Sequence, residues 1–534
     1  MVDRSEKRWN WGFALITLGL TSLPYLVGYW AQGSSFHFLG FVFGVDDGNS
    51  YIAKMLAGAS GDWLFRTPYT AYTQSGAFSF FPYLLLGKLA YPPGQHEQLV
   101  FLFQLFRWIG GFLVIFATYD FVALFLQRVN YRRLATAMVT LGGGLGWLFA
   151  LGLSSLWQGR IPLEFYSPET FGFLSVLGLP HLEVARACLL WGMREYLVNS
   201  HEFAYRRVVK GGLLWLGIGL FQPLTVVTGW VILGLHVVIT SIFINIKEFQ
   251  PLRIFSKERG RFVTAFGMVL ISCPIVLYTF IAFSLDPFLK SWTEQNLILS
   301  PPISDYLLAF LNVLPLTISG IVFVIRTKKW DAILPAAWVI VFPVLAYAPY
   351  NLQRRLPEGI WVAVVILAFI FIENKLARYQ KTIRLWAAAA FLSTLFFFAG
   401  SALTAAAPIS PLFISLNEVK AFHSLGELVN KGDVVLADFR ISNELPAWLP
   451  VRTVVGHGPE SINASQLTPR IDSFFATSGQ NSARIALIQE LAIKYIVLGP
   501  EEQTSTNWDP GSSGIAELVY QDPDFKIFRI VVPK

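Results

Sequence analysis

The stretch WGFALITLGLTSLPYLVGYW, residues 11–30, contains no charged side chain and ends in an aromatic pair. A helix that crosses the hydrocarbon core of a bilayer needs about 20 mostly apolar residues. Similar runs recur along the 534-residue chain, in which 54% of residues are hydrophobic and the mean hydropathy is +0.53. Charged residues make up only 14%, against about 25% in ordinary soluble domains. The sequence therefore predicts a polytopic α-helical membrane protein and excludes a cytosolic enzyme, a disordered chain and a disulfide scaffold.

The apolar runs predict about eleven transmembrane helices, with the N-terminus on the cytoplasmic side. Loops that face the cytoplasm are enriched in Lys and Arg. In this arrangement 22 basic residues fall in cytoplasmic segments and 7 in outer loops. The apolar stretch 78–91 is too short to span, so we interpret it as an interfacial or re-entrant helix on the outer face. The expected spans are roughly 11–30, 106–126, 134–155, 180–198, 208–223, 225–246, 262–284, 304–325, 332–349, 357–373 and 385–406.

The composition changes near residue 408. Residues 408–534 hold 10 Lys and Arg against 14 Asp and Glu, a net charge of −4, whereas residues 1–407 carry +11. Alternating helical and strand patterns in this tail favour a small sheet with some parallel pairing. We expect a transmembrane region over 1–407 and a soluble extracytoplasmic α/β domain over 408–534. The patterns predict helices at 416–430 and 482–492 and strands at 432–439, 494–500 and 524–532.

Common catalytic signatures are missing from the sequence. There is no phosphate-binding loop of the Walker type, no HExxH, no GxSxG and no CxxC. The stretch GHGPE at 456–460 has the wrong spacing for a phosphate loop, and GGGLG at 142–146 falls in an expected span, where glycines allow close helix packing. Cys188 and Cys273 lie in apolar stretches and imply neither a disulfide nor a Cys-based metal site.

The first outer loop, about residues 31–105, carries an adjacent acid pair. Its sequence FGVDDGNSYIAKMLAGASGDWLFRTPYT places Asp46 and Asp47 just before an amphipathic helical pattern over 48–59, with Tyr51 on the apolar face. The pair is either a helix cap or a catalytic carboxylate at the mouth of a membrane cavity. Adjacent carboxylates raise each other's pKa, which suits a general base. We interpret Lys54 as part of a solvated helix face.

Two adjacent arginines in APYNLQRRLPEG, residues 348–359, break the positive-inside pattern. Arg354 and Arg355 are either snorkelling or paired with Glu358, or they form an anion site, since arginine forks match phosphate oxygens. Lys88 and Arg107 are weaker candidates of the same kind. Gln353 is a further candidate for the lining of the same cavity.

Other polar residues fall near the outer ends of expected spans. PHLEVAR at 180–186 places His181 and Glu183 at membrane depth, where ionisable groups usually line a cavity. The alternative is an internal pair of Glu183 with Arg186. In DPFLKSWTEQN, Trp292 either stacks on a sugar or anchors the loop at the interface.

This arrangement resembles the GT-C superfamily of glycosyltransferases that use polyprenyl-phosphate-linked sugars. The resemblance rests on VDDGNSY at 45–51, WLFRTPYT at 63–70, the Pro-His helix start at 180–181, the long first outer loop and the terminal α/β segment. Protein O-mannosyltransferases and lipid A aminoarabinose-transfer enzymes belong to this superfamily.

The resemblance implies that Asp46 or Asp47 deprotonates an acceptor hydroxyl, which displaces the polyprenyl phosphate from the sugar with inversion. The partners would be a polyprenyl-phosphate-linked hexose or pentose, a glycan, lipid or protein acceptor, and the bilayer of a cell membrane; no nucleic acid is implied. No cofactor is required, although the acid pair leaves a divalent cation possible.

Three other functions fit the same sequence. A transporter or flippase would show internal repeats and mid-membrane charges, and we find neither pattern. A ligase or polymerase of lipid-linked glycans would share the layout and differ in its donor. A membrane scaffold would act through its tail alone.

Overall fold

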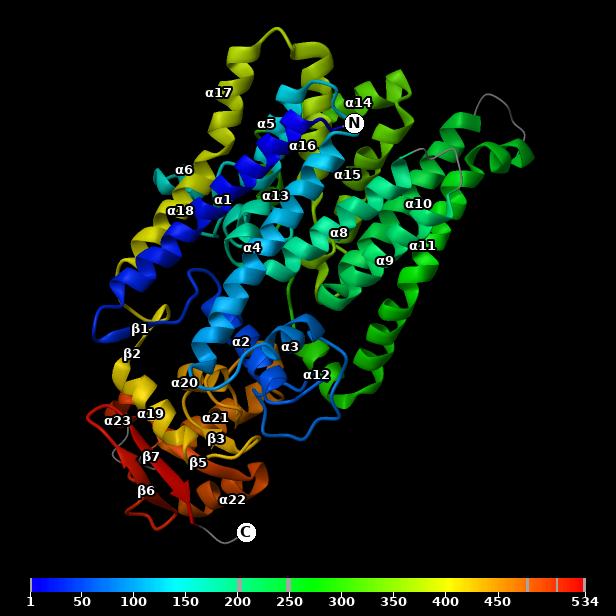
Figure 1. Cartoon of the computed structure of the whole chain (residues 1–534). Coiled ribbons are helices and arrows are strands. Elements are labelled where there is room, and N and C mark those ends of the chain that lie inside the picture. Colours follow the sequence, from blue (N-terminus) through cyan, green and yellow to red (C-terminus); the bar gives the residue numbers. More distant parts are fainter. Residues whose placement is uncertain (1, 199–203, 246–250, 477–479, 506–507, 532–534) are drawn as a thin grey trace. The chain divides into compact units, whose positions relative to one another are not determined.

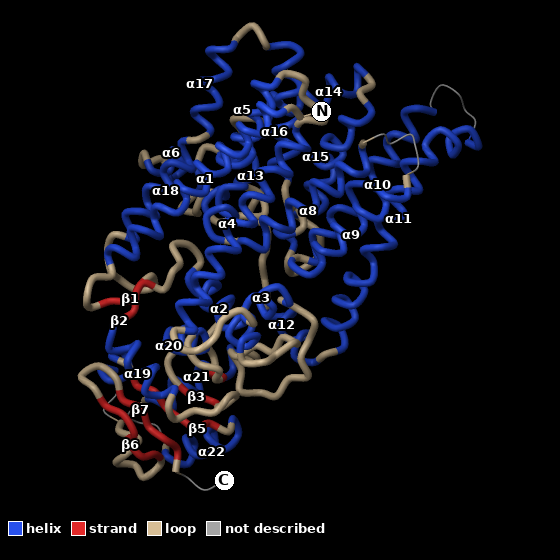
Figure 2. Tube along the Cα trace, viewed as in Figure 1, coloured by secondary structure: helices blue, strands red, loops and turns tan. Residues whose placement is uncertain are grey.

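A computed structural model describes residues 2–198, 204–245, 251–476, 480–505 and 508–531. The chain forms two compact units, each assembled from three segments. Unit 1 comprises Met1–Leu23, Leu105–Phe280 and Ile298–Ser401, and unit 2 comprises Pro24–Gln104, Ile281–Leu297 and Ala402–Lys534. In Figure 2 the helices dominate the trace, and the strands gather in the C-terminal segment and in a small pair that includes the first loop.

Unit 1 is helical, and four of its helices continue into unit 2. Figure 1 labels α1 (Arg4–Ala31), α4 (Gln95–Val122), α5 (Val129–Leu141), α6 (Trp147–Ala150), α8 (Pro180–Leu197), α9 (Tyr205–Phe221), α10 (Pro223–Asn245), α11 (Pro251–Leu285), α13 (Ile303–Phe310), α14 (Leu314–Thr327), α15 (Ile333–Ala346), α16 (Ile360–Phe371), α17 (Gln380–Ala390) and α18 (Leu392–Ala405); α7 spans Gly172–Gly178.

Six helices among the described residues are long and apolar enough to cross a membrane. A seventh span is formed if α13 and α14, which bend by 83°, count together. Helices α8, α9 and α15 occupy three further expected spans but are shorter or more polar than this criterion requires. The structure thus supports a helical membrane protein, while the count of eleven spans stays a prediction.

The stretch 134–155 was expected as one continuous helix, and the structure shows that it is interrupted. Helix α5 ends at Leu141, and the glycines 142–146 form a turn before the four-residue α6. These glycines permit close backbone approach: a Cβ on Gly144 would lie 2.4 Å from the carbonyl oxygen of Ala309. The N–H of Gly146 donates to Glu164 Oε1 over 2.5 Å, a contact that a continuous helix would not allow.

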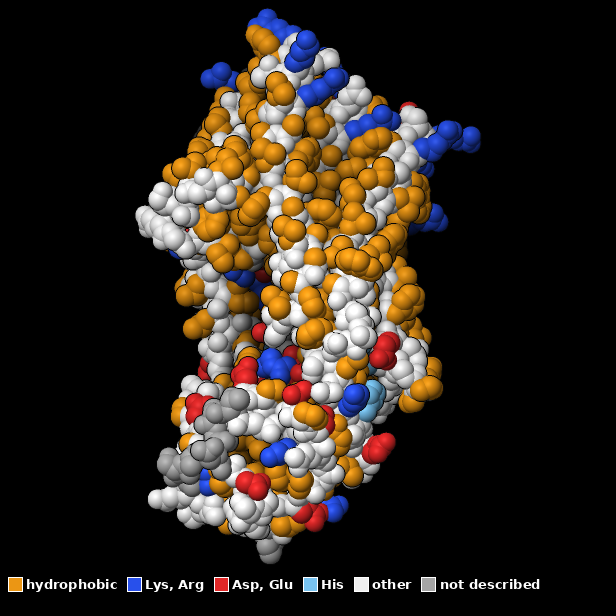
Figure 3. All heavy atoms as spheres, turned by 90° about the vertical axis from the view of Figure 1, so that its left-hand side faces the viewer, with side chains coloured by type: hydrophobic (Ala, Val, Ile, Leu, Met, Phe, Trp, Pro, Cys, Tyr) orange, Lys and Arg blue, Asp and Glu red, His pale blue; other side chains and the backbone are white. Residues whose placement is uncertain are grey.

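The space-filling view shows where the charges of unit 1 lie. Figure 3 shows a broad hydrophobic band over its helices, with Lys and Arg gathered at the upper end of that band. This pattern agrees with the separation of charge used to orient the spans, although the orientation itself stays a prediction. Lys247, one of the expected cytoplasmic residues, lies outside the described residues.

The core of unit 1 is built around α16. Its sequence IWVAVVILAFIF is apolar on every side, and all of its residues except Phe371 are buried. A helix that is hydrophobic all round belongs in a core. Gly320 of α14 packs directly against its backbone, since a Cβ there would meet the Leu367 carbonyl at 2.1 Å.

Unit 2 joins the first loop to the tail. Helix α2 (Val45–Ala59) packs against α3 (Phe81–Gly87), which is the only helical part of the stretch expected as an interfacial helix at 78–91. Strand β1 (Phe36–Phe38) of the first loop pairs antiparallel with β2 (Phe413–Ser415) of the tail. The first loop and the tail are therefore one compact unit.

The tail contains a five-stranded mixed sheet in the order β4-β3-β5-β7-β6. Strand β3 is parallel to β4 and β5, as the alternating pattern predicts, and β7 is antiparallel to β5 and β6. The expected helices and strands are present, whereas β2, β4 and β6 were not expected. The elements are α19 (Leu416–Gly426), β3 (Val434–Leu436), α20 (Phe439–Glu444), β4 (Arg452–Thr453), α21 (Ala464–Phe475), α22 (Asn481–Leu491), β5 (Ile493–Leu498), α23 (Pro500–Ser505), β6 (Ala516–Gln521) and β7 (Lys526–Ile530).

Candidate active site

The acid pair lies in the first turn of α2. Gly44 is the N-cap, in the left-handed conformation at φ 58°, and no side chain caps the helix. The alternative that the acid pair caps the helix is therefore wrong. Consecutive helical residues are rotated by about 100°, so the exposed carboxylates of Asp46 and Asp47 leave α2 in different directions. Both complement the positive N-terminal end of the helix.

Asp47 meets a histidine from the tail. The Oδ1 atom of Asp47 lies 3.2 Å from Nε2 of His457, while 58% of the Asp47 side chain stays exposed. On the other side of the ring, Nδ1 of His457 lies 3.7 Å from Oε1 of Glu460. The imidazole thus stands between two carboxylates: Nε2 is within hydrogen-bond distance of Asp47, whereas the separation of Nδ1 from Glu460 exceeds a hydrogen bond. His457 comes from GHGPE, whose importance the motif comparison missed.

Behind His457 is a buried ion pair. Lys54 is only 1% exposed, and its Nζ lies 2.7 Å from Glu460 Oε1 and also bonds Ser50. Thr67 donates to the second oxygen, Oε2, over 2.8 Å. Burial raises the pKa of Glu460, but Lys54, His457 and Thr67 outweigh it and leave the pKa below its ordinary value. The interpretation of Lys54 as a solvated residue is wrong, because its partner comes from the tail.

Further contacts hold α2 against the tail. Asn49 donates to the side chain of Asn443 over 2.9 Å, and Asn443 donates to the main-chain oxygen of Asp46 over 3.3 Å. Tyr69 donates to the carbonyl of Asn443 over 3.1 Å. Burial, followed by the charges of Glu460, Asp46 and Asp47, raises the pKa of Tyr69 well above its ordinary value. Tyr69 therefore stays neutral beside the acids.

Tyr51 and Trp292, two expected lining residues, pack in aromatic clusters of unit 2. The ring of Tyr51 stacks on Tyr83 at 4.7 Å between centroids. Trp292 in α12 (Pro287–Gln295) is buried and lies 5.6 Å from the ring centroids of both Phe80 and Phe283. These contacts give Trp292 a packing role in the loop.

The arginine pair lies in unit 1, in a short 3-10 helix over Gln353–Arg355. Between the two guanidinium groups lies Glu169, whose carboxylate is 4.0 Å from Nε of Arg354 and 3.9 Å from Nε of Arg355. These distances exceed a hydrogen bond, and neither buried Nε has a hydrogen-bond acceptor among the described residues. The Arg354 guanidinium also lies 5.1 Å from the Tyr166 ring. The half-buried pair with the neighbouring Gln353 therefore keeps donors that an anion could use.

The alternative in which these arginines pair with Glu358 is wrong. Glu358 pairs with Arg186 of α8 at 2.6 Å, and both side chains are buried. Arg186 also donates to the carbonyls of Pro168 and Glu169, over 2.6 and 3.0 Å. The N–H of Gly359 donates to the same Glu169 carbonyl over 2.8 Å. These bonds fix the loop that presents the Glu169 carboxylate.

Glu183 and His181 lie on the same helix as Arg186. The carboxylate of Glu183 is fully buried and has no hydrogen-bond donor among the described residues, so the internal pair with Arg186 is absent as a hydrogen bond. It packs against Gly110 and Gly111 of α4. His181 is half-buried in the first turn of α8.

The two weaker cation candidates have structural contacts. Lys88 donates to the carbonyls of Gly58 and Asp62, over 3.2 and 3.0 Å, and so closes the C-terminal end of α2. Arg107 of α4 is 1% exposed and donates to Ser22 Oγ over 2.7 Å and to the Val176 carbonyl over 3.3 Å. Both side chains therefore have structural roles, since their donors bind other segments of the chain.

Metal ligands are sparse around the acid pair. Among the described residues no group of three or more His, Cys, Asp or Glu side chains is placed to hold a metal ion. Asp47 and His457 supply two ligand groups, fewer than a protein site for a divalent cation normally uses. The residues present therefore do not form a complete site.

The long apolar helices support a helical membrane protein with several spanning segments. The oligosaccharyltransferase of Archaeoglobus fulgidus has a similar structure, with a TM-score of 0.55 and 12% identity over 96% of this chain and 72% of the other, in a complex with Zn and sulfate. The same enzyme, AglB, with an inhibitory peptide and a dolichol-phosphate matches at a TM-score of 0.54 and 12% identity over 97% and 73%.

ArnT from Cupriavidus metallidurans matches at a TM-score of 0.49 and 12% identity over 97% of this chain and 98% of the other. No protein-family model matches the chain, and comparison with curated proteins gives no match either. The likeness to AglB is one of fold, and it confirms the resemblance to the GT-C superfamily at that level.

Proposed function

We propose that this chain is a membrane glycosyltransferase that moves a hexose or pentose from a polyprenyl-phosphate donor to an acceptor hydroxyl, with inversion at the sugar. The observation that carries the proposal is the contact of Asp47 with His457 in a chain of GT-C fold. A general base must be held in one direction and yet reach the substrate. Asp47 satisfies both conditions, since it is partnered on one side and largely exposed.

The reaction follows from these groups. Asp47 accepts the proton of the acceptor hydroxyl as its oxygen attacks the sugar C1. The new bond joins the acceptor oxygen to C1, and the bond from C1 to the phosphate oxygen breaks. The electron pair leaves with polyprenyl phosphate. Attack opposite the leaving group inverts the configuration at C1.

Arg354 and Arg355 are proposed to bind the donor phosphate. The donor is a phosphodiester with one negative charge, and the departing monoester gains a second as the bond breaks. Cations with unused donors stabilise that charge as it develops. The pair fits this role because its contacts with Glu169 are longer than hydrogen bonds. AglB, which shares the fold, has been seen with a dolichol-phosphate, and this supports a lipid-phosphate donor.

We further propose that the chain is a multi-pass protein of the cell membrane, with a cytoplasmic N-terminus and the tail outside. Transfer of a preassembled glycan is a second candidate, favoured by the likeness to an oligosaccharyltransferase. The step described above uses no cofactor, and we assign no part of it to a metal ion.

The test uses the purified full chain in proteoliposomes with radiolabelled polyprenyl-phosphate hexoses and pentoses, and polyprenyl-diphosphate glycans as the competing donors. We expect release of polyprenyl phosphate together with a product of inverted anomeric configuration, both with and without a chelator. Movement of the donor across the bilayer without sugar transfer would establish a flippase instead. Transfer only from the diphosphate glycans would establish the second candidate.

A further inference from the structure

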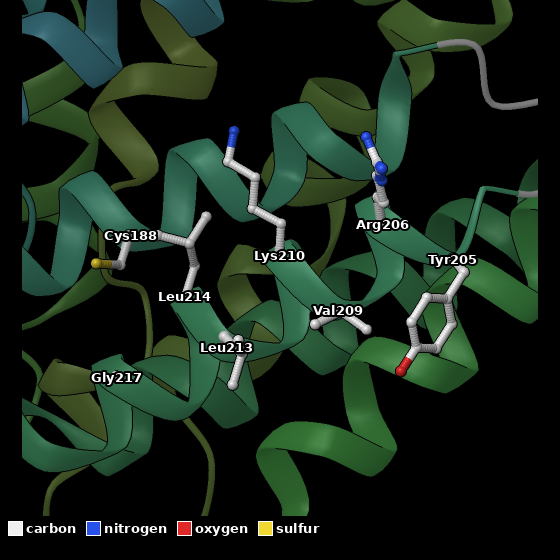
Figure 4. Close-up of a pocket in the computed structure, with 8 residues that line it drawn as sticks. All are labelled: Cys188, Tyr205, Arg206, Val209, Lys210, Leu213, Leu214 and Gly217. Atoms are coloured by element: carbon white, nitrogen blue, oxygen red, sulfur yellow. The ribbon is translucent and has the colours of Figure 1, made fainter.

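A surface cavity of about 530 Å³ lies in unit 1 on the outer faces of α8 and α9. Its wall on α9 combines two basic side chains, Arg206 and Lys210, with the apolar Leu213 and Leu214. In Figure 4 the charged ends of Arg206 and Lys210 extend to the same side of the helix. None of these residues belongs to the candidate active site.

The floor of this groove is open at Gly217. A Cβ added there would meet nothing within 4 Å, so a larger side chain at this position would project into the open groove. Leu213 is exposed at 55%, which is expected for a side chain that faces lipid. Leu213, Leu214 and Gly217 make this part of the groove apolar.

The basic side chains at one end of the groove are only partly neutralised by acidic partners. Arg206 and Lys210 are both exposed, and Lys210 lies 2.7 Å from Oε1 of Glu195 on α8. Glu195 also contacts Arg194 at 3.1 Å, so one carboxylate is shared between two cations. The basic residues therefore outnumber their described acidic partner, and an anion beside Lys210 and Arg206 would balance the charge.

We propose that this groove binds an anionic phospholipid, with the phosphate headgroup between Arg206 and Lys210 and one acyl chain along Leu213 and Gly217. A groove that is basic at one end and apolar along its length matches an amphiphile with a negatively charged head. This lipid is bound apart from the sugar donor, and the inference is independent of the proposed function.

Selectivity must come from the headgroup. An acyl chain leaves one apolar environment for another when it enters the groove from the bilayer, so the chain alone gives little net affinity. Each basic residue near an anionic membrane surface contributes roughly a five-fold preference. Because Lys210 already shares Glu195, we expect a preference of roughly 5- to 30-fold for anionic over zwitterionic lipid.

The experiment measures lipid retained by the full chain after reconstitution in mixed phosphatidylcholine and phosphatidylglycerol vesicles and extraction, by native mass spectrometry. Two variants attack the groove independently. Arg206→Gln with Lys210→Gln removes the charges, and Gly217→Leu places a bulky side chain in the groove. We expect each to lose most of the preference for phosphatidylglycerol shown by the unmodified chain.

Matched controls separate the groove from general effects. Lys381→Gln with Arg384→Gln removes two exposed charges from α17, and Gly234→Leu fills another position where a Cβ meets nothing within 4 Å. Both controls should retain phosphatidylglycerol normally. The proposal is wrong if the unmodified chain retains both lipids equally, or if the groove variants match their controls. A change of assembly mass in Gly217→Leu without a change in lipid would identify an interface between copies instead.

Discussion

Unit 2 holds the first-loop site, formed by Asp47, Lys54, His457 and Glu460, and unit 1 holds the arginine pair. The charges of the two regions differ in how closely they are paired. Lys54 and Glu460 lie 2.7 Å apart and are almost fully buried, with further bonds from Ser50 and Thr67. Arg354 and Arg355 contact one carboxylate, Glu169, at 3.9–4.0 Å. Buried polar groups normally find partners. Charges paired at hydrogen-bond distance hold a fold together, whereas donors without close acceptors are available to a substrate.

The largest effect is expected from a change at Asp47, the exposed residue of the first-loop site. Asp47→Asn keeps the size of the side chain but removes its capacity to accept a proton, so kcat for sugar transfer should fall by about 10²- to 10⁴-fold. Single-turnover transfer from a lipid-phosphate donor measures this. Asp62→Asn, which alters a first-loop carboxylate in a surface pair with Lys431, is the matched control and should stay active. Full activity in both Asp47→Asn and Asp46→Asn would remove the acid pair from the mechanism.

The buried end of the same site should govern stability. Lys54→Met leaves Glu460 charged and unpaired in the interior, which should lower the free energy of unfolding by about 3–5 kcal/mol. The double variant Lys54→Met with Glu460→Met should recover part of that loss, because it removes both charges. Breaking the exposed pair of Arg470 and Glu490 should cost less than about 1 kcal/mol. Chemical denaturation of the purified chain in detergent measures the free energy of unfolding of each variant. Equal losses of stability on breaking the buried and the exposed pair would contradict the prediction.

The same ion pair predicts a dependence on pH. The pKa of Glu460 is lowered in the fold, despite its burial, by Lys54, His457 and Thr67, so its contribution to stability is complete above the ordinary value of about 4.5. That contribution is lost as the pH falls below this value. Glu460→Gln should flatten the acid limb of the stability curve, and an unchanged acid limb would show that Glu460 is not the group concerned.

In the arginine pair, loss of one cation should weaken donor binding. Arg354→Ala and Arg355→Ala should each raise the KM for the lipid-phosphate donor about 10- to 100-fold, the range for a hydrogen bond to a charged group. Arg355→Lys should recover only part of the donor affinity that Arg355→Ala loses, because an ammonium group lacks the planar fork of a guanidinium. Arg160→Ala, in a basic residue already bonded to both oxygens of Asp305, is the control. Unchanged donor dependence in both alanine variants would place the phosphate elsewhere.

Local patterns in the sequence predicted much of the fold. Long apolar runs predicted most of the helices, since burial or lipid contact leaves a direct mark on composition. The alternation in the tail predicted β3, β5 and β7 and their partly parallel sheet. The break at 142–146 was missed because its glycines are apolar by composition, and only their close contact with Ala309 shows that the helix ends.

The sequence did not predict the residues of the candidate site whose roles depend on contacts between distant parts of the chain. The acid pair and the arginines stood out because they are charges in unusual places. His457 and Glu460 did not, because their significance depends on contacts with Asp47 and Lys54, about 400 positions earlier. Glu169 was missed for the same reason. A periodicity argument assigned Lys54 to solvent, since nothing local indicates which face of α2 the tail covers.

The smallest expected effect concerns His457, which joins the exposed and buried ends of the first-loop site. His457→Ala should lower kcat about 10-fold, the worth of one hydrogen bond that holds Asp47, and should leave the KM for the donor unchanged. His457→Gln, whose amide can still reach Asp47, should recover part of the rate. His423→Ala, in a tail histidine that packs against Trp448, is the control.

The pH profile of kcat distinguishes two roles for His457. If His457 only supports the fold, His457→Ala should change the stability and leave this pH profile unchanged. A shifted profile with unaltered unfolding would show that His457 acts through the Asp47 carboxylate, and an unaltered profile would contradict that role.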